Sequence, residues 1–288
     1  MLHILRNRKD LADHLQQLRA NGLSLGFVPT MGALHEGHLS LVQIAYEKTD
    51  HVVVSIFVNP SQFNNSKDLA LYPRDVYGDI EKLETTDCHT IYIPSVEDVY
   101  PPDYVQPRYN LGEVENSLEG SSRPGHFQGV AAVLERFFTD IGPEKAFFGE
   151  KDYQQVAVVR KLVELKQLPI EIVACPTLRE KDGLAMSSRN RRLSPEMRTQ
   201  AANIFAEMQK ISKVNTVEEL ILKLDQSRAF LNSIDGFSVE YLEVANSQTF
   251  DPITKHSLQL PRNQWRVFAA VNVGGVRLID NCALESEL

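Results

Sequence analysis

Two histidines with a glycine between them, His35 and His38, form the most informative group of side chains in the sequence. They belong to the segment PTMGALHEGH at residues 29–38. Residues three apart can lie on one side of a helical turn, so both imidazoles could donate hydrogen bonds to one phosphate group. Gly32 and Gly37 would let the backbone approach that phosphate closely. Such donors would stabilise the charge that gathers on a phosphorus atom in its transition state.

Two alternatives to phosphate binding are weaker. Single histidines are usually structural or solvated, but an H-x-G-H pattern where a strand gives way to a helix is rare by chance. A zinc site would need a third ligand, and no Cys, His or carboxylate stands at a recognisable spacing. Phosphate binding is therefore the favoured interpretation.

Two further segments follow predicted strands. The segment FGEKDYQQ, residues 148–155, offers Gly149 for close backbone contact, Lys151 for phosphate, and Asp152 for ribose hydroxyls or for capping a helix. A solvated turn would have a similar composition. The segment NPSQF, residues 59–63, carries neutral amides, which suit an uncharged polar group such as a hydroxyl.

A third segment, REKDGLAMSSRN at residues 179–190, combines two hydroxyls with a guanidinium. The side chains of Ser187, Ser188 and Arg189 could hold phosphate oxygens, and a loop at a domain boundary can close over a nucleotide. An exposed basic linker is the alternative interpretation of this segment.

The spacing of apolar residues predicts elements that bring these segments to one edge of a sheet. The expected strands are 23–28, 52–58, 90–93, 145–148 and 170–174, and the expected helices are 10–20, 39–48, 74–85, 128–138 and 152–168. The run VVVSIFV barely alternates, as is typical of a strand buried on both faces of a parallel sheet. We therefore expect a doubly wound, Rossmann-like α/β domain over residues 1–175. Its ligands should bind at the carboxyl ends of the strands, where a helix start would offer unpaired N–H groups.

The pattern changes after residue 175. Helices are expected over 195–212 and 216–232, followed by strands at 238–244, 265–271 and 276–279 that alternate like antiparallel strands. Residues 176–288 are therefore expected to form a smaller α+β domain.

Composition narrows the class of protein. The chain has 288 residues, of which 43% are hydrophobic and 24% charged, so it can form packed cores. The net charge of −8 argues against a general binder of nucleic acid or of anionic membranes. No stretch approaches the roughly 18 apolar residues needed to span a bilayer, and the three cysteines form no C-x-x-C pair. We expect a cytoplasmic protein with reduced thiols and small-molecule partners.

Five segments taken in order, PTMGALHEGH, NPSQF, RPGHFQGV at residues 123–130, FGEKDYQQ and AMSSRN, carry a family resemblance. The H-x-G-H turn with a downstream Met-Ser-Ser-Arg loop resembles the nucleotidyltransferase superfamily. More narrowly, the five segments resemble pantothenate synthetases, the pantoate-β-alanine ligases of coenzyme A biosynthesis. Each segment alone is weakly specific, but all five in this order are highly specific. The last 95 or so residues carry no motif of the family.

The resemblance implies an activity and a set of site residues. Pantoate and ATP would give pantoyl adenylate and pyrophosphate, and β-alanine would then displace AMP. The implied catalytic residues are His35, His38, Lys151 and Arg189. Gln62 and Gln155 would hold pantoate, and Gln62 would also contact β-alanine. The implied ATP-binding residues are Met31, Gly32, Ala33, Leu34, His35, Glu36, Gly37, His38, Gly149, Glu150, Lys151, Asp152, Leu178, Met186, Ser187, Ser188 and Arg189.

The resemblance also implies a homodimer, a smaller domain that closes over ATP, and magnesium bridging the phosphates with few protein ligands. Asp75 and Asp79 are candidate outer ligands, and an exposed helix face would explain both equally well. The role of residues 123–130 is left open between the pantoate pocket and a subunit contact.

Two other functions remain to be separated from the ligase. An adenylyltransferase of the same superfamily would use a phosphorylated acceptor and would need more cations near Gln62 and Gln155. A nucleotide-binding regulatory protein would bind ATP without turnover.

Overall fold

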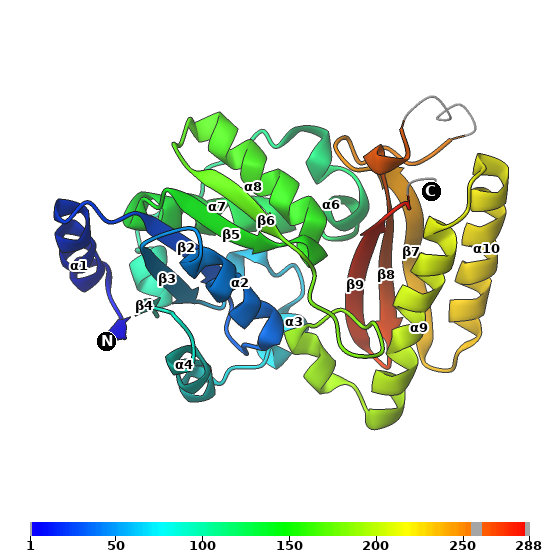
Figure 1. Ribbon diagram of the computed structural model, residues 1–288, viewed down its shortest axis with the longest axis horizontal. Helices are drawn as coiled ribbons and strands as arrows, with labels where there is room; N and C mark the ends of the chain where they lie inside the picture. The colour runs from blue at the N-terminus through cyan, green and yellow to red at the C-terminus, as the bar shows by residue number, and fades with distance from the viewer. Residues whose placement is uncertain (1, 255–260, 286–288) are drawn as a thin grey trace. The chain divides into compact units, whose positions relative to one another are not determined.

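The computed structural model describes residues 2–254 and 261–285, and the chain forms two compact units (Figure 1). The first unit comprises Met1–Glu115, Arg123–Glu150 and Gln154–Pro176, and the second comprises Asn116–Ser122, Lys151–Tyr153 and Thr177–Leu288. The chain last crosses from the first unit to the second after Pro176, one residue beyond the boundary expected after residue 175. Two short segments from the first part of the chain belong to the second unit, which a single boundary in the sequence does not represent.

The first unit contains a six-stranded parallel sheet, which confirms the Rossmann-like fold class. The strand order is β1-β4-β3-β2-β5-β6, and every pair is parallel. The strands are β1 (His3–Leu5), β2 (Leu25–Thr30), β3 (His51–Ile56), β4 (Thr90–Tyr92), β5 (Lys145–Gly149) and β6 (Glu171–Cys175). The helices are α1 (Arg8–Ala20), α2 (Glu36–Tyr46), α3 (Ser66–Leu71), α4 (Val76–Glu84), α5 (Val96–Val99), α7 (His126–Ile141) and α8 (Tyr153–Lys166).

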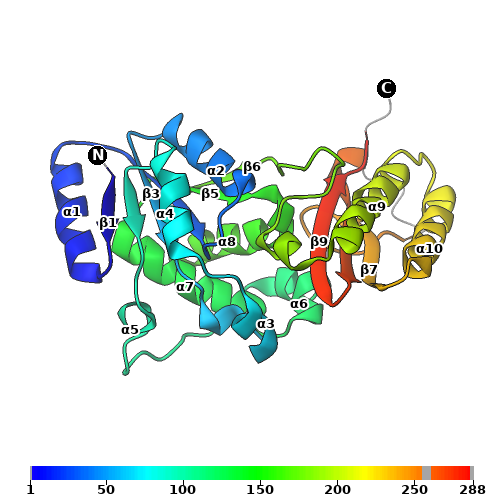
Figure 2. The ribbon, with the colours of Figure 1, turned by 90° about the horizontal axis from the view of Figure 1, so that it is seen from below.

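Two apolar layers cover the two faces of this sheet. Side chains alternate along each strand, so Phe27 packs with α1, α7 and α8, whereas Val28 packs with α2 and α4. The same alternation separates Val53 from Val54 on β3. Helices on both faces of the sheet bury every residue of β3, which explains why β3 has no polar face and reads as a continuous apolar run (Figures 1 and 2).

A proline ends the pairing between β2 and β5. The carbonyl of Leu25 accepts a hydrogen bond from Glu144 on the β5 side, and that of Thr30 faces β3. Since alternate residues face alternate neighbours, Pro29 has its missing N–H on the β5 side. The pairing of β2 with β5 stops at Phe27. Pro29 therefore costs no sheet hydrogen bond, and the two strands separate at their carboxyl ends.

The second unit contains a three-stranded antiparallel sheet with two helices on one face (Figure 2). Its strands are β7 (Phe237–Asn246), β8 (Trp265–Val273) and β9 (Val276–Ala283), and its helices include α6 (Leu118–Ser122), α9 (Pro195–Ser212) and α10 (Val217–Ser233). Apolar residues of α9 and α10 pack on the sheet. Within residues 2–254 and 261–285, no helix is long and apolar enough to cross a membrane.

The expected elements are present with ends shifted by a few residues, and several short ones were not expected. β1, α3, α5 and α6 have three to six residues each, too few to show a period. β9 continues four residues beyond the expected end at Ile279, because Asp280 and Asn281 are buried with polar partners. All three cysteines are free, as expected.

Candidate active site

Two of the candidate segments leave the sheet at its topological switch point. β2 lies between β3 and β5, so the strand order reverses between β2 and β5. The H-x-G-H turn follows β2, and the segment beginning at Gly149 follows β5. Ligands of open α/β sheets bind at such a point, outside the carboxyl ends of the strands.

A tight turn connects β2 to the two histidines. Gly32 and Ala33 both have positive φ, +77° and +50°, which for alanine costs about 1–2 kcal/mol. The Thr30 hydroxyl accepts a hydrogen bond from the Gly32 N–H at 3.2 Å and donates to the Ser55 carbonyl at 2.6 Å. The turn is thereby fixed to the end of β2 and to β3.

The two imidazoles lie at the start of α2, with ring centroids 4.1 Å apart. His35 is the N-cap, and its Nδ1 accepts from the Gly37 N–H at 3.2 Å. His38 Nδ1 accepts from the His35 N–H at 3.3 Å. Since both Nδ1 atoms accept, a neutral ring carries its proton on Nε2 in each case. Both side chains are half-buried, so the pair can meet a ligand.

The expectation of unpaired N–H groups at this helix start is wrong for most of the turn. The N–H groups of Ala33 and Leu34 donate to Asp79, and those of His35 and Gly37 donate to the two imidazoles. Acceptors from α4 and from the two imidazoles of the turn therefore satisfy these amides. The donor that each neutral imidazole has beyond these contacts is its Nε2–H group.

Gln62 contacts the start of the same turn. Its Nε2 donates to Met31 Sδ at 3.0 Å, and its Oε1 accepts from Asn59 Nδ2 at 3.0 Å. Only 8% of Gln62 is exposed. The Asn59 amide also donates to the Gly129 carbonyl at 3.1 Å. The H-x-G-H and NPSQF segments, separated by about 30 residues, therefore meet as expected.

The segment 123–130, whose role was left open, supports the NPSQF turn. His126 is buried and its Nδ1 lies 2.8 Å from the Gln62 carbonyl, while Arg123 Nη1 lies 3.1 Å from His126 Nε2. A Cβ on Gly129 would lie 2.2 Å from the Ser61 carbonyl oxygen, so only glycine allows this approach. The segment therefore positions Gln62 through contacts with its backbone and with Ser61.

The FGEKDYQQ segment divides between the two units. Gly149 ends β5 and is followed by Glu150 in the first unit, whereas Lys151 and Asp152 belong to the second. Gln155 lies in the first turn of α8, in the first unit, and is half-buried. Lys151 Nζ lies 3.4 Å from Asp152 Oδ1.

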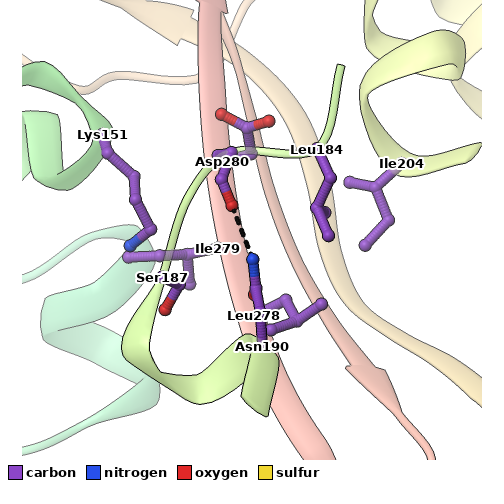
Figure 3. A pocket seen from close by; sticks show the side chains of 9 residues that line it. Lys151, Leu184, Ser187, Asn190, Ile204, Leu278, Ile279 and Asp280 are labelled. Carbon is purple, nitrogen blue, oxygen red and sulfur yellow. Dashed lines mark hydrogen bonds between the residues drawn. The ribbon is translucent and has the colours of Figure 1, made fainter. Parts of the chain in front are cut away.

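The loop that contains the Met-Ser-Ser-Arg residues is a folded hairpin rather than an exposed linker. The Met186 N–H donates to the Leu178 carbonyl at 3.0 Å, which pairs two of the residues implied for ATP binding. The Ser187 hydroxyl accepts from the Arg189 N–H at 3.3 Å. Asn190 Nδ2 closes the loop on the Ala185 carbonyl at 3.1 Å (Figure 3).

A pocket in the second unit brings Lys151 and Ser187 together (Figure 3). The remaining residues that line it are Leu184, Ala185, Asn190, Ile204, Leu278, Ile279 and Asp280. Two polar residues of β9 make contacts at this pocket, one with Arg179 and the other with the backbone of Lys151. Asp280 pairs with Arg179 through both oxygens, at 2.6 and 2.9 Å, and Asn281 Nδ2 donates to the Lys151 carbonyl at 2.9 Å.

Sequence reasoning missed these two β9 residues, as it missed His126. A single Asp-Asn pair at the end of a strand gives no signal by composition or spacing. Their importance arises from partners more than 100 positions away in the chain.

The two aspartates considered as outer metal ligands have other partners. Asp75 is the exposed N-cap of α4 and accepts from Gly78, whereas Asp79 is fully buried, which excludes the solvated-face interpretation for Asp79. Burial raises the pKa of Asp79, opposed by its bonds to Leu34 and Ala33. Among residues 2–254 and 261–285, no group of three or more His, Cys, Asp and Glu is placed to hold a metal ion.

Comparisons with known proteins agree over the whole chain. A family model for pantoate-beta-alanine ligases matches residues 3–283. The pantothenate synthetases of Christiangramia forsetii and Porphyromonas gingivalis are 42% and 41% identical to this chain, and each alignment covers 99% of the chain and 100% of the relative. The crystal structure of the pantothenate synthetase from Thermus thermophilus matches with a TM-score of 0.88 at 37% identity and covers 99% of both chains. A pantoate-beta-alanine ligase from Francisella tularensis, complexed with beta-gamma ATP and beta-alanine, matches with a TM-score of 0.81 at 35% identity and covers 100% of this chain and 99% of that one.

Proposed function

The chain belongs to the pantoate-beta-alanine ligase family, a family of ligases, and we propose that it joins pantoate to β-alanine through a pantoyl adenylate. In the first half-reaction, a pantoate carboxylate oxygen attacks the α-phosphorus of ATP and pyrophosphate leaves. In the second, the unprotonated β-alanine amine attacks the acyl carbon, AMP leaves with the electrons of the acyl–oxygen bond, and the nitrogen loses a proton to give the amide. The adenylate is needed because a free carboxylate would have to expel oxide.

The two histidines stabilise the phosphates in the first half-reaction. Each ring has Nδ1 bound to the backbone, so Nε2–H is the donor for phosphate oxygens. We assign His38 as the donor that stabilises charge on the reacting phosphate, and His35 as its support. Met31 to His38 and Gly149 to Asp152 contact ATP in this proposal, and Lys151 supplies a point charge for phosphate oxygens.

Residues of the hairpin complete the ATP-binding set. Ser187, Ser188 and Arg189 bind phosphate oxygens, Met186 completes the ATP site, and Leu178 contacts the adenine. The pairing of Leu178 with Met186 in the hairpin supports this assignment, as does the shared pocket of Lys151 and Ser187. The second unit would close over bound ATP.

Gln62 and Gln155 bind pantoate, and Gln62 also contacts β-alanine. The Gln62 Nε2 donates to a thioether, which is a weak acceptor. A hydroxyl or carboxylate oxygen of the substrate is a better acceptor, so the amide gains a stronger hydrogen bond when substrate replaces the Met31 sulfur as its acceptor. The amide pair suits an uncharged polar group better than the phosphorylated acceptor of an adenylyltransferase.

The single observation that carries the proposal is the pair of Nε2 donors at the switch point, with the Gln62 amide bound to Met31 of the same turn. We expect ATP to enter as its magnesium complex, with phosphate oxygens and water as the main ligands of the ion. We also expect a homodimer and a cytoplasmic location.

Exchange of radiolabelled pyrophosphate into ATP tests the function. The ligase requires pantoate and magnesium for exchange and does not require β-alanine. Exchange that depends on a phosphorylated acceptor would favour an adenylyltransferase. ATP binding with no exchange under any of these conditions would favour a regulatory nucleotide-binding protein.

A further inference from the structure

Asp79, on α4, lies beneath the H-x-G-H turn and has no role in the reaction as described so far. None of its surface is exposed, and its two oxygens accept from consecutive backbone N–H groups. Oδ2 lies 2.7 Å from the Ala33 nitrogen, and Oδ1 lies 2.6 Å from the Leu34 nitrogen. These are short, charge-assisted hydrogen bonds between segments 45 and 46 positions apart in the chain.

The turn is shaped to receive this carboxylate. Gly32 and Ala33 have positive φ, and in this turn the N–H groups of Ala33 and Leu34 both donate to the same carboxylate. A Cβ on residue 32 would lie 2.9 Å from Asp79 Oδ2, so glycine is needed for the approach. A left-handed alanine persists only where its surroundings impose it, and the two bonds to Asp79 do so.

The carboxylate acts on the histidines through one residue. Leu34 is fully buried and directly precedes His35, the N-cap of α2. Its N–H is held by Asp79, so the position of Asp79 sets where His35 begins the helix. His38 is bound in turn to the His35 N–H. Displacement of Leu34 therefore moves both imidazoles together.

We propose that Asp79 is a positioning residue, which fixes the H-x-G-H turn so that both imidazole Nε2 groups meet the phosphates of ATP. The inference rests on the proposed function and adds the group that sets its geometry. Asp79 itself touches no substrate, and its effect is on the first half-reaction. Gln62 is bound to Asn59 and His126 as well as to Met31 of the turn, and its bond to Met31 is the one that substrate replaces in the proposed function, so we expect the KM for pantoate not to depend on Asp79.

The test compares Asp79→Asn with a matched control at the other end of β2. Asparagine has one oxygen, so its NH₂ group faces either the Ala33 or the Leu34 N–H and pushes the turn away. Asp50→Asn makes the same change at a carboxylate whose Oδ2 accepts from the Ser24 N–H at 2.9 Å, just before β2 begins. In pantoate-dependent exchange, we expect kcat to fall about 10²-fold in Asp79→Asn, with the KM for pantoate unchanged. Asp50→Asn should keep the wild-type kcat.

A second variant loosens the same turn without changing the charge of a buried group. Thr30→Val keeps the side-chain shape and removes the hydroxyl that binds the Gly32 N–H and the Ser55 carbonyl. It should lower kcat about tenfold, again with an unchanged KM for pantoate. This variant decides the matter if Asp79→Asn does not fold.

Several outcomes would overturn the inference. These are equal rates in Asp79→Asn and Asp50→Asn, a rise in the KM for pantoate in place of a fall in kcat, or a folded Thr30→Val enzyme at the wild-type rate. Wild-type protein that shows no pantoate-dependent exchange would instead refute the proposed function, so the two failures are distinguishable.

Discussion

Replacement of His38 by asparagine and by glutamine distinguishes the roles of the two nitrogen atoms of its ring. Asparagine places a polar atom near the position of Nδ1, so its oxygen can still accept from the His35 N–H. It offers nothing at the position of Nε2. Glutamine reaches the Nε2 position and can donate there through its NH₂ group, but it loses the Nδ1 acceptor. The first variant keeps the turn and removes the donor, and the second does the reverse.

The expected loss follows from the role of the donor. Removal of one preorganised donor from a transition-state site typically costs about 3–4 kcal/mol, which corresponds to about 10²–10³ in kcat. The bond at Nδ1, 3.3 Å long, is worth about 1 kcal/mol and contributes much less. We therefore expect His38→Asn to lose about 10²–10³ in the kcat of pantoate-dependent exchange, and His38→Gln to recover most of it.

His89→Asn is the matched control for this pair. His89 Nδ1 also accepts a backbone N–H, from Val52 at 3.0 Å, at the amino ends of the strands. The same substitution there should leave kcat unchanged. Wild-type exchange by His38→Asn would refute the donor assignment. Equal losses in His38→Asn and His38→Gln would show that the ring acts through its shape or charge rather than through a neutral Nε2–H.

Two more substitutions test packing and protonation in the first unit. Gly129→Ala places a methyl group against the Ser61 carbonyl and should lower the free energy of unfolding by about 1–3 kcal/mol, as measured by denaturation. It should also raise the KM for pantoate in the exchange assay, because the displaced Ser61 moves Gln62. An unchanged KM would disprove this connection between Gly129 and Gln62. His51→Gln keeps a bond to the Thr90 hydroxyl and removes a ring whose pKa burial lowers from 6.5 to about 4. Because the unfolded chain protonates first, wild-type stability should fall as the pH drops from 6.5 toward 4. Between pH 7 and pH 5, the free energy of unfolding measured with urea should fall by up to about 2 kcal/mol less in the variant than in the wild type. Equal falls in the two proteins would contradict the assigned pKa.

The histidines near His51 also have lowered pKa values, so their protonation should likewise reduce stability as the pH falls. His14 and His89 both have pKa values lowered mainly by burial, and the rings of His3, His14, His51 and His89 follow one another at centroid distances of 4.5–5.6 Å. Asp87 opposes the shift at His89. Nothing in the sequence placed these four histidines together, because they come from α1 and from the starts of three different strands.

Local pattern was enough for the main elements of the fold. The apolar run of β3 and the 3.6-residue spacing of α1 report burial directly, so the alternation of strands and helices could be predicted. The short β1 and α3 could not, since three to six residues do not define a period. The polar end of β9 was missed because burial of Asp280 depends on Arg179, which lies far away in the chain.

The sequence by itself determined which chemistry the chain can perform. Imidazoles three residues apart, glycines beside them and neutral amides after a buried strand are local features, and residue type and spacing express them completely. Tertiary structure alone decided how those groups are held. Asp79 occupies the amides expected to bind phosphate, His126 supports Gln62, and Asn281 holds Lys151. Each of these contacts joins residues 45 or more positions apart, and a single hydrogen bond between distant residues leaves no period or spacing in a sequence.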